Sequence, residues 1–218
     1  MLQNINDRSH KDHKFFERYL DNDLDDLSNF LQEKYKLIES AKLHGVQEIG
    51  KDDFYWMESG SISTVKWREY NVFQLYHPGI YKLLKNIKEV LKEACDYYEV
   101  DFDQKQYYIQ GWFNINHSDT GKLDWHDHGG PYSPFFHGYY CVNAEPSVTH
   151  YKLFNDDNKV VENKNFNNRL IVSEMGHPHA MGDWTWDGPR ITIAYDLMPL
   201  KSLINNEMTV EQHWVPLV

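Results

Sequence analysis

Cysteine is scarce in this sequence, with only Cys95 and Cys141 among 218 residues. Two thiols are too few for the disulfide framework that holds many small secreted domains together, so we expect a cytoplasmic protein in a reducing compartment. No apolar run approaches the roughly 18 residues that a membrane-spanning helix needs. The polar stretch from Met1 to Lys14 also has no signal-peptide hydrophobic region. We therefore expect neither secretion nor a membrane partner.

Positive charge is in deficit. Lys and Arg number 22 against 33 Asp and Glu, which gives a formal net charge of −11. This surplus repels phosphate backbones, and no basic cluster in the sequence offsets it, so we expect no binding to a nucleic-acid duplex. Hydrophobic residues make up 41% and charged residues 25%. These proportions are typical of a globular chain rather than a disordered one.

Aromatic residues and histidine, by contrast, are abundant. The chain has 7 Trp, 15 Tyr, 11 Phe and 12 His. Seven of the histidines fall between Asn114 and Gly182. This stretch is therefore where we look for chemistry.

Hydrophobic spacing predicts a mostly helical support over residues 1–100. Apolar residues recur at helical intervals from Phe15 to about residue 45, interrupted by an acidic segment, Asp21–Asp26, that is either a solvated helix face or a short break. A second helix begins at His77-Pro78-Gly79, where proline suits the first turn, and should end near Asp96–Glu99. Its apolar stripe, from Ile80 to Ala94, is typical of a helix that backs a sheet.

After residue 101 the pattern changes to period two. Five segments predict β-strands: Gln106–Asn116, His137–Val142, Thr149–Phe154, Arg169–Val172 and Arg190–Tyr195. Many short strands separated by turn signals indicate a sandwich or barrel. Because the sequence shows no repeat or linker, we expect one domain over 1–218, with a β core over 101–200 and a C-terminal tail over 201–218.

The segment from Asp124 to His128 could bind a metal ion. On a strand, Asp124, His126 and His128 would project from one face, about 7 Å apart at each step of two residues. Two imidazoles at a strand end can converge on one ion, and imidazole suits iron, zinc, copper or nickel. A third ring must come from elsewhere in the chain, and His177 and His179 are the two candidates.

An isolated histidine is more often a packed or surface residue than a ligand. A strand-borne His-x-His with a distant histidine after another strand favours metal binding over coincidence. The remaining histidines lack such a spacing partner, and we interpret them as structural or surface residues: His10, His13, His44, His77, His117, His137, His150 and His213.

Arg190 and Thr192 share one face of the last predicted strand. A buried guanidinium needs a carboxylate partner, because an unpaired buried charge is costly. Its planar fork recognises a carboxylate with two hydrogen bonds. An acidic cosubstrate would fit, and so would an aspartate of the same chain.

Six segments in this order carry a family resemblance: Trp112-Phe113-Asn114, His126-Asp127-His128, Gly138-Tyr139-Tyr140, Arg169-Leu170-Ile171-Val172, His179 and Arg190-Ile191-Thr192. Together they resemble the Fe(II)/2-oxoglutarate-dependent oxygenases, over about residues 106–200. More narrowly, they resemble a branch seen often in phages and marine bacteria, in which an H-x-H step precedes a Tyr-Tyr strand. The resemblance implies a mainly β fold, with a double-stranded β-helix (jelly-roll, cupin-like) core backed by N-terminal helices.

The resemblance also implies roles for individual residues. His126 would be the first ligand of Fe(II) and His179 the distal one. Arg190 would bind the far carboxylate of 2-oxoglutarate, with Thr192 or Tyr140 adding a hydrogen bond.

Further positions match contacts of related enzymes. Asn114 and Asn116 lie where such enzymes contact cosubstrate or substrate. Trp184 and Trp186 follow the distal histidine, where a substrate-facing loop is expected; core packing is the equal alternative.

One departure from the family concerns the carboxylate. Most members have an H-x-D or H-x-E step, which completes two imidazoles and one carboxylate around the iron. Here His128 occupies the carboxylate position. A three-imidazole iron, recruitment of Asp124, or a substrate-binding role for His128 would each account for this. His177 is the alternative to His179 as the distal ligand. The spacing between His179 and Arg190, and the strand that precedes them, favour His179.

The resemblance therefore predicts a non-haem Fe(II)- and 2-oxoglutarate-dependent dioxygenase that uses O₂ to hydroxylate a small molecule or peptide. Since His128 is not small enough to admit a chloride ligand, hydroxylation is favoured over halogenation. One alternative is a three-His cupin-type metal dioxygenase or isomerase that uses no 2-oxoglutarate. The other is a non-catalytic jelly-roll binding module.

Overall fold

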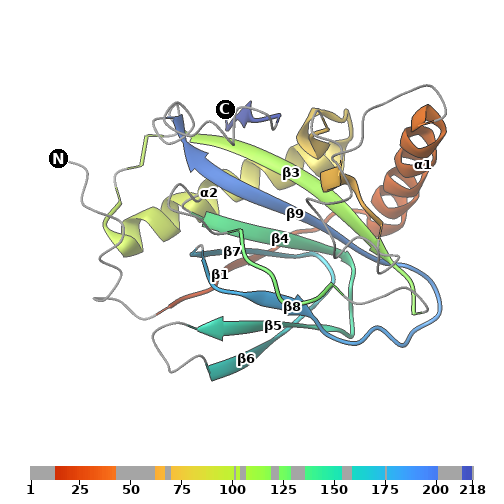
Figure 1. The fold of residues 1–218 in the computed structure, drawn as a ribbon. Helices are drawn as coiled ribbons and strands as arrows, with labels where there is room; N and C mark the ends of the chain where they lie inside the picture. The colour runs from red at the N-terminus through yellow and green to blue at the C-terminus, as the bar shows by residue number, and fades with distance from the viewer. Residues whose placement is uncertain are drawn as a thin grey trace.

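Two antiparallel sheets form the body of the protein in the computed structural model (Figure 1), which describes residues 13–42, 62–66, 70–100, 102–103, 107–118, 123–128, 136–153, 159–174, 176–200 and 213–217. The larger sheet has the strand order β1-β7-β4-β9-β3-β10, with β2 paired to β3, and the smaller has the order β6-β5-β8. The strands are β1 Phe16–Tyr19, β2 Ile62–Ser63, β3 Tyr107–Asn116, β4 Phe136–Asn143, β5 Val148–Leu153, β6 Lys159–Lys164, β7 Arg169–Glu174, β8 His179–Met181, β9 Arg190–Pro199 and β10 Val215–Pro216.

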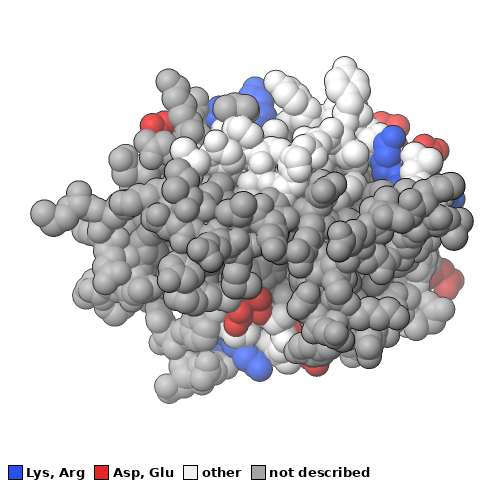
Figure 2. Space-filling view, turned by 45° about the horizontal axis from the view of Figure 1, so that its top comes forward, with Lys and Arg blue, Asp and Glu red and all other residues white. Residues whose placement is uncertain are grey.

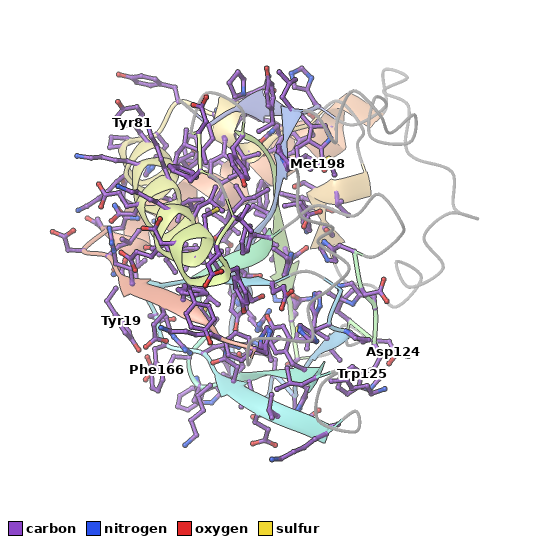
Figure 3. All side chains as sticks on the ribbon, turned by 90° about the vertical axis from the view of Figure 1, so that its left-hand side faces the viewer. Tyr19, Tyr81, Asp124, Trp125, Phe166 and Met198 are labelled. Carbon is purple, nitrogen blue, oxygen red and sulfur yellow. The ribbon has the colours of Figure 1, made fainter. Side chains whose placement is uncertain are left out.

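Two α-helices, α1 (Leu24–Lys42) and α2 (Pro78–Tyr98), pack against the larger sheet. Short 3₁₀ turns, η3 (Thr64–Lys66) and η4 (Val72–Gln74), lie beside β3. In Figure 3, Tyr81 of α2 lies on one side of the strands, whereas Asp124 and Trp125 lie on the other. The helices therefore cover one face of the larger sheet and leave the other face to the histidine-bearing segments. The predicted mainly β architecture with supporting helices is confirmed.

The second helix has the ends that its sequence predicts. Nδ1 of His77 accepts a hydrogen bond from the backbone N–H of Gly79 at 3.1 Å, and Pro78 occupies the first turn. Glu99 ends the helix in the left-handed region, with a φ of 57°. The face carrying Ile80, Leu83, Ile87, Val90 and Leu91 is fully or almost fully buried.

The larger sheet separates two apolar clusters because successive side chains of a strand alternate between its faces. On the helix side, Leu27 and Leu91 pack with Phe113 and Tyr195. Between the two sheets, residues of the larger sheet pack against Tyr151 of β5: Trp112, Tyr139, Cys141, Ile171 and Ala194. The candidate site lies in this second space.

The prediction of helix from Phe15 onward is wrong for its first part. Residues Phe16–Tyr19 form β1, which pairs antiparallel with β7, Phe16 lying opposite Val172. Pairing with an available sheet edge outweighs local helical spacing here. Of the acidic segment, residues 21–23 form the break before α1 and residues 24–26 its first turn, where Asp23 Oδ1 accepts from the N–H of Asp26. The predicted end of this helix near residue 45 lies outside the described residues.

The five predicted strands correspond to β3, β4, β5, β7 and β9, although Gln106 and Phe154 lie outside the described residues. The sequence pattern did not indicate β6 and β8. The first is a polar edge strand of the smaller sheet, and the second is only three residues long. Of the predicted tail, the structure describes 213–217, where β10 pairs with β3.

The described surface carries scattered charge. On the face shown in Figure 2, the coloured basic and acidic side chains are dispersed rather than gathered into one patch. Within the described part of the chain, neither long helix is apolar enough over a sufficient length to cross a membrane.

Candidate metal centre

A pair of backbone hydrogen bonds joins His126 to His179. The N–H of His126 donates to the carbonyl of His179 at 3.0 Å, and the N–H of His179 donates to the carbonyl of His126 at 2.8 Å. This exchange is an antiparallel bridge: His126 lies outside the named strands, whereas His179 is the first residue of β8. Residues facing each other across such a bridge project side chains to the same side, and the two ring centroids lie 4.4 Å apart.

His128 completes a group of three imidazoles. Its ring centroid lies 5.5 Å from that of His126 and 5.2 Å from that of His179. One ring nitrogen from each of the three residues lies within 4.8 Å of the others. The structure thus brings together the three histidines that the sequence singled out.

Hydrogen bonds orient all three rings in the same way. Nδ1 of His126 donates to the carbonyl of Asp124 at 2.8 Å, Nδ1 of His179 donates to the carbonyl of His177 at 3.2 Å, and Nδ1 of His128 donates to Oδ1 of Asp196 at 2.8 Å. Because each acceptor has no hydrogen, each Nδ1 must carry one. In its neutral form each ring therefore has its lone pair on Nε2, the arrangement typical of metal-binding histidines.

Burial keeps two of these rings, those of His126 and His179, uncharged. Desolvation, with repulsion from His128 as the next cause, lowers the pKa of His126 to about 4. Desolvation likewise holds the pKa of His179 well below its ordinary value, with smaller contributions from the neighbouring rings. Both rings are neutral at pH 7, and a metal ion binds neutral imidazole.

Two residues beside this group were missed in the sequence. His137 of β4 was interpreted as structural or a surface residue, but its ring lies 4.2 Å from His128 and 4.7 Å from His179, centroid to centroid. Nδ1 of His137 donates to Oδ1 of Asp196 at 3.1 Å. Asp196 lies directly opposite His137 in the β4–β9 register. The sequence signal was that each of the two is a polar residue between non-polar neighbours of its strand.

Asp196 is ionised in spite of its burial. Burial alone raises the pKa of this carboxyl, but the attraction of His128 and the hydrogen bonds from His128 and His137 outweigh that effect and lower the pKa to about 2. Desolvation, followed by repulsion from His128, lowers the pKa of His137 to about 4. A carboxylate that accepts from a ligand's Nδ1–H fixes the ring and makes it a stronger donor to a metal.

A cavity of about 460 Å³, including its open mouth, adjoins the three imidazoles. Its walls come from both sheets and from the segment that carries the His-x-His step: Trp112, Asn114, Leu123, His126, His128, His137, Tyr139, Thr149, His179, Ala180, Met181, Arg190, Thr192 and Ala194. The candidate metal ligands and the predicted cosubstrate residues Asn114, Arg190 and Thr192 therefore share one cavity.

Arg190 is buried, with 5% of its surface exposed. Its Nε donates to Oγ of Ser147 at 3.0 Å, and no carboxylate of the described residues forms an ion pair with it. Desolvation accordingly lowers its pKa, although a guanidinium remains charged at pH 7. A buried cation without an internal anion fits a site that takes an anionic ligand.

The predicted contact from Tyr140 is wrong. Its side chain points to the helix side of β4, where its hydroxyl donates to Oδ1 of Asn168 and accepts from Nδ2 of Asn22. The preceding residue, Tyr139, lines the cavity instead, because neighbours on a strand face opposite ways. Its hydroxyl donates to Oδ1 of Asn165 at 3.0 Å.

Asp124 and His177, the alternative ligands, do not belong to the three-imidazole group. Asp124 is exposed, and its Oδ1 accepts from the N–H of Trp125 at 2.7 Å. His177 faces His13 and Glu174 in a neighbouring cluster.

The predicted substrate residues are not among those that line the cavity. Asn116 is buried beside Arg190, its partner in the β3–β9 register. Trp184 is buried, and its indole N–H donates to the carbonyl of Gly188 at 3.0 Å. Trp186 is 58% exposed.

Three solved enzyme structures have a similar fold. A prolyl-4-hydroxylase from Pseudomonas putida has a TM-score of 0.52 and 8% identity, with 89% of this chain and 96% of that chain covered. The α-ketoglutarate-dependent carbocyclase SnoK from nogalamycin biosynthesis has a TM-score of 0.52 and 11% identity, with 88% and 82% covered. The epimerase SnoN from the same biosynthesis has a TM-score of 0.52 and 11% identity, with 88% and 80% covered.

The chain has the fold of these three enzymes. The double-stranded β-helix that the sequence resemblance implied is thereby confirmed. No family model and no curated protein sequence matches the chain. At these identities the comparisons establish the fold, and the argument for an activity depends on the site itself.

Proposed function

We propose that this protein is a non-haem Fe(II)- and 2-oxoglutarate-dependent oxygenase that hydroxylates a small molecule or peptide. The observation that carries the proposal is the sharing of one cavity by three imidazoles and an arginine without an internal carboxylate partner among the described residues. The first feature suits a first-row transition metal, and the second suits an acidic cosubstrate.

His126, His128 and His179 fit an Fe(II) ion. All three rings present Nε2, and two of them are held neutral by burial. Three neutral ligands leave the full double positive charge on the ion, one unit more than a set with a carboxylate. This surplus favours a dianionic cosubstrate, and the ionised Asp196 behind His128 offsets part of it. Asp196 is thus not a proposed ligand, but it supplies next to the site the negative charge that the H-x-H step lacks.

Each cavity residue has a definable part in this chemistry. Bound Fe(II), with 2-oxoglutarate and O₂, would supply the oxidising power for attack on a C–H bond. Arg190 would hold the distal carboxylate of 2-oxoglutarate, and Thr192 and Asn114 would add hydrogen bonds from the same face of the sheet. Ser147 positions the guanidinium through Nε, and it accepts in turn from Nδ2 of Asn165 at 2.9 Å. The apolar wall formed by Trp112, Leu123 and Met181 would exclude bulk water.

The main alternative is a three-His cupin-type dioxygenase or isomerase without 2-oxoglutarate. The same three imidazoles support it, because such an enzyme needs the metal and no arginine. The position of Arg190 in the wall of the metal-facing cavity favours the oxygenase, since a buried guanidinium at that place has no part in the alternative.

Anaerobic titration separates the two functions. Protein prepared without a polyhistidine tag is loaded with Fe(II), and 2-oxoglutarate is added while the visible spectrum is recorded. The proposal predicts a metal-to-ligand charge-transfer band, which His126→Ala abolishes by removing the metal. An unchanged spectrum from metal-loaded wild-type protein would favour the cupin-type alternative. Failure to bind metal at all would favour the non-catalytic module.

The substrate class is tested by succinate release. Metal-loaded protein is incubated with O₂, 2-oxoglutarate and pools of small metabolites or peptides, with Arg190→Met as the negative control. A pool that raises succinate release above the uncoupled background contains the substrate. His150→Ala, which changes a half-buried histidine outside the three-imidazole group, is the matched control for loss of an imidazole.

A further inference from the structure

A second group of potential ligands lies next to the three-imidazole centre. It consists of His13, Glu174 and His177, which each offer one donor atom within 4.8 Å of the other two. The rings of His13 and His177 lie 4.2 Å apart, centroid to centroid, at an interplanar angle of 75°. Nε2 of His177 lies 3.9 Å from Oε2 of Glu174. The three side chains come from the segment before β1, the end of β7 and the connection between β7 and β8.

His13 is the unexplained member of this group. Both of its ring nitrogens are buried, and neither has a hydrogen-bond partner among the described residues. An imidazole that gives up water without a replacement partner destabilises the fold, unless a ligand completes it. The ring is also uncharged, because burial and then repulsion from His177 lower its pKa to about 3. A buried neutral imidazole of this kind has a lone pair that can coordinate a metal ion.

The fold holds these donors together through strand pairing. In the β1–β7 register Phe16 lies opposite Val172, so His13, three residues earlier, extends toward the residues that follow β7. The ring of Phe15 anchors this segment against Tyr151, with centroids 4.8 Å apart. The donors therefore lie on two segments far apart in sequence, and an ion shared by them would join those segments.

We propose that His13, Glu174 and His177 form a second metal site, which takes a divalent first-row transition ion such as Zn²⁺ and joins the segment before β1 to the β7–β8 connection. Two imidazoles and one carboxylate suit such an ion in both charge and donor type. The three donor atoms already lie within 4.8 Å of one another, and bonds of roughly 2.0–2.2 Å to one ion would bring them closer together.

The second site is separate from the first, although the two are neighbours. Its donor group shares no member with His126, His128 and His179. The Tyr151 ring stacks on His179 at 5.5 Å and lies between that residue and Phe15. Neither Glu174, His13 nor His177 lines the cavity that contains Arg190. The ion here would join the two segments and would not face that cavity. It would also steady the carbonyl of His177, which accepts from Nδ1 of His179.

Metal counting in matched variants tests this site. Tag-free protein is stripped with a chelator, dialysed against Co²⁺, and assayed for bound cobalt and for its visible d–d absorption. We expect two equivalents in the wild type, one in His13→Ala and one in His126→Ala. Glu174→Gln, which preserves the shape of the side chain, should also retain one. His213→Ala, an exposed histidine outside both groups, should retain two.

The outcomes distinguish the two sites. If the wild type binds one equivalent that His126→Ala loses and His13→Ala keeps, the second site does not exist. If the wild type binds one equivalent that His13→Ala loses and His126→Ala keeps, the second site exists and the proposed catalytic centre fails. Circular dichroism confirms that each variant is folded. A Co²⁺-dependent rise in melting temperature that survives in His126→Ala but not in Glu174→Gln would further support the second site.

Discussion

Nδ1 of His128 lies 2.8 Å from Oδ1 of Asp196, a carboxylate on β9 that is 68 residues away in sequence. The same oxygen accepts from His137, so one buried anion orients two adjacent rings. In this centre the carboxylate hydrogen-bonds to a proposed metal ligand instead of being a ligand itself. The ligand proposed in its place, His128, is thereby polarised toward any metal ion bound at its Nε2.

Removing the charge of Asp196 should weaken the metal site. We expect Asp196→Asn to lower Fe(II) affinity roughly 10- to 100-fold, because His128 loses the anion that fixes its ring and raises its basicity. Anaerobic Fe(II) titration measures the change. Asp187→Asn, at an exposed loop position, should have wild-type affinity. Equal affinities in a folded Asp196→Asn protein would refute this role.

The free energy of unfolding of the metal-free protein should decrease as the pH is lowered. His126 and His137 have a pKa of about 4 in the folded state, chiefly through burial, against an ordinary value of 6.5. Between these values the unfolded chain binds protons that the folded chain does not, so the free energy of unfolding decreases as pH falls from about 6.5 to about 4. The folded pKa of Asp196, about 2 against 3.8, adds a further loss at still lower pH.

Urea unfolding of the chelator-treated protein at about pH 7.5 and about pH 5 measures this dependence. The urea midpoint should be lower at the acidic pH. His213→Ala, which changes an exposed ring, should show the same drop as the wild type. A midpoint that is independent of pH would mean that the site imidazoles titrate normally.

Arg190→Met should separate cosubstrate binding from folding. Loss of a charged contact should weaken 2-oxoglutarate binding to metal-loaded protein roughly 10- to 150-fold. The free energy of unfolding should change by less than about 1 kcal/mol, since no carboxylate of the described residues loses an ion-pair partner and Ser147 keeps its bond from Asn165. Calorimetric titration with 2-oxoglutarate measures the first effect and urea unfolding the second.

Arg18→Met is the matched control for Arg190→Met. Arg18 lies on β1, pairs with Glu89 and Glu93 on α2 and is partly exposed. Its loss should leave 2-oxoglutarate affinity unchanged. Similar affinities in the two variants would show that Arg190 does not contact the cosubstrate.

Gly138→Ala should destabilise the sheet at the centre of the fold. A Cβ at this position would clash with the carbonyl oxygen of Ile171 and come within 2.6 Å of the Tyr195 ring. We expect a loss of about 1–3 kcal/mol in the free energy of unfolding. In Gly188→Ala the new Cβ has no neighbour within 4 Å. Only the φ of +91°, which is unfavourable for alanine, lowers the free energy of unfolding, by about 1 kcal/mol. Urea unfolding should therefore rank Gly138→Ala as the less stable variant.

Local patterns in the sequence were enough for some of these features. Proline in the first turn and an apolar stripe predicted both the start and the end of α2, because helix signals act within a few residues. Alternation predicted the long strands β3 and β9 for the same reason. The helix predicted at Phe16 failed because that residue pairs with Val172, a partner 156 positions away that local spacing does not encode.

Strand register decided which neighbours enter the cavity. The sequence contained the Gly138-Tyr139-Tyr140 run, but only the pairing of β4 with β7 and β9 turns Tyr139 inward and Tyr140 toward the helices. A change of one residue in register would reverse the two. The assignment of Tyr140 was therefore a guess between adjacent positions.

By itself, the sequence determined the chemical inventory of the centre: a His-x-His step, a distant histidine and an arginine on a late strand. The tertiary structure alone decided that His126 faces His179 across a two-residue bridge, that Asp196 and His137 stand behind His128, and that Arg190 opens into the same cavity. The physical reason is range. Residue type and spacing specify which groups can bind a metal or an anion, whereas long-range strand pairing specifies which of them meet.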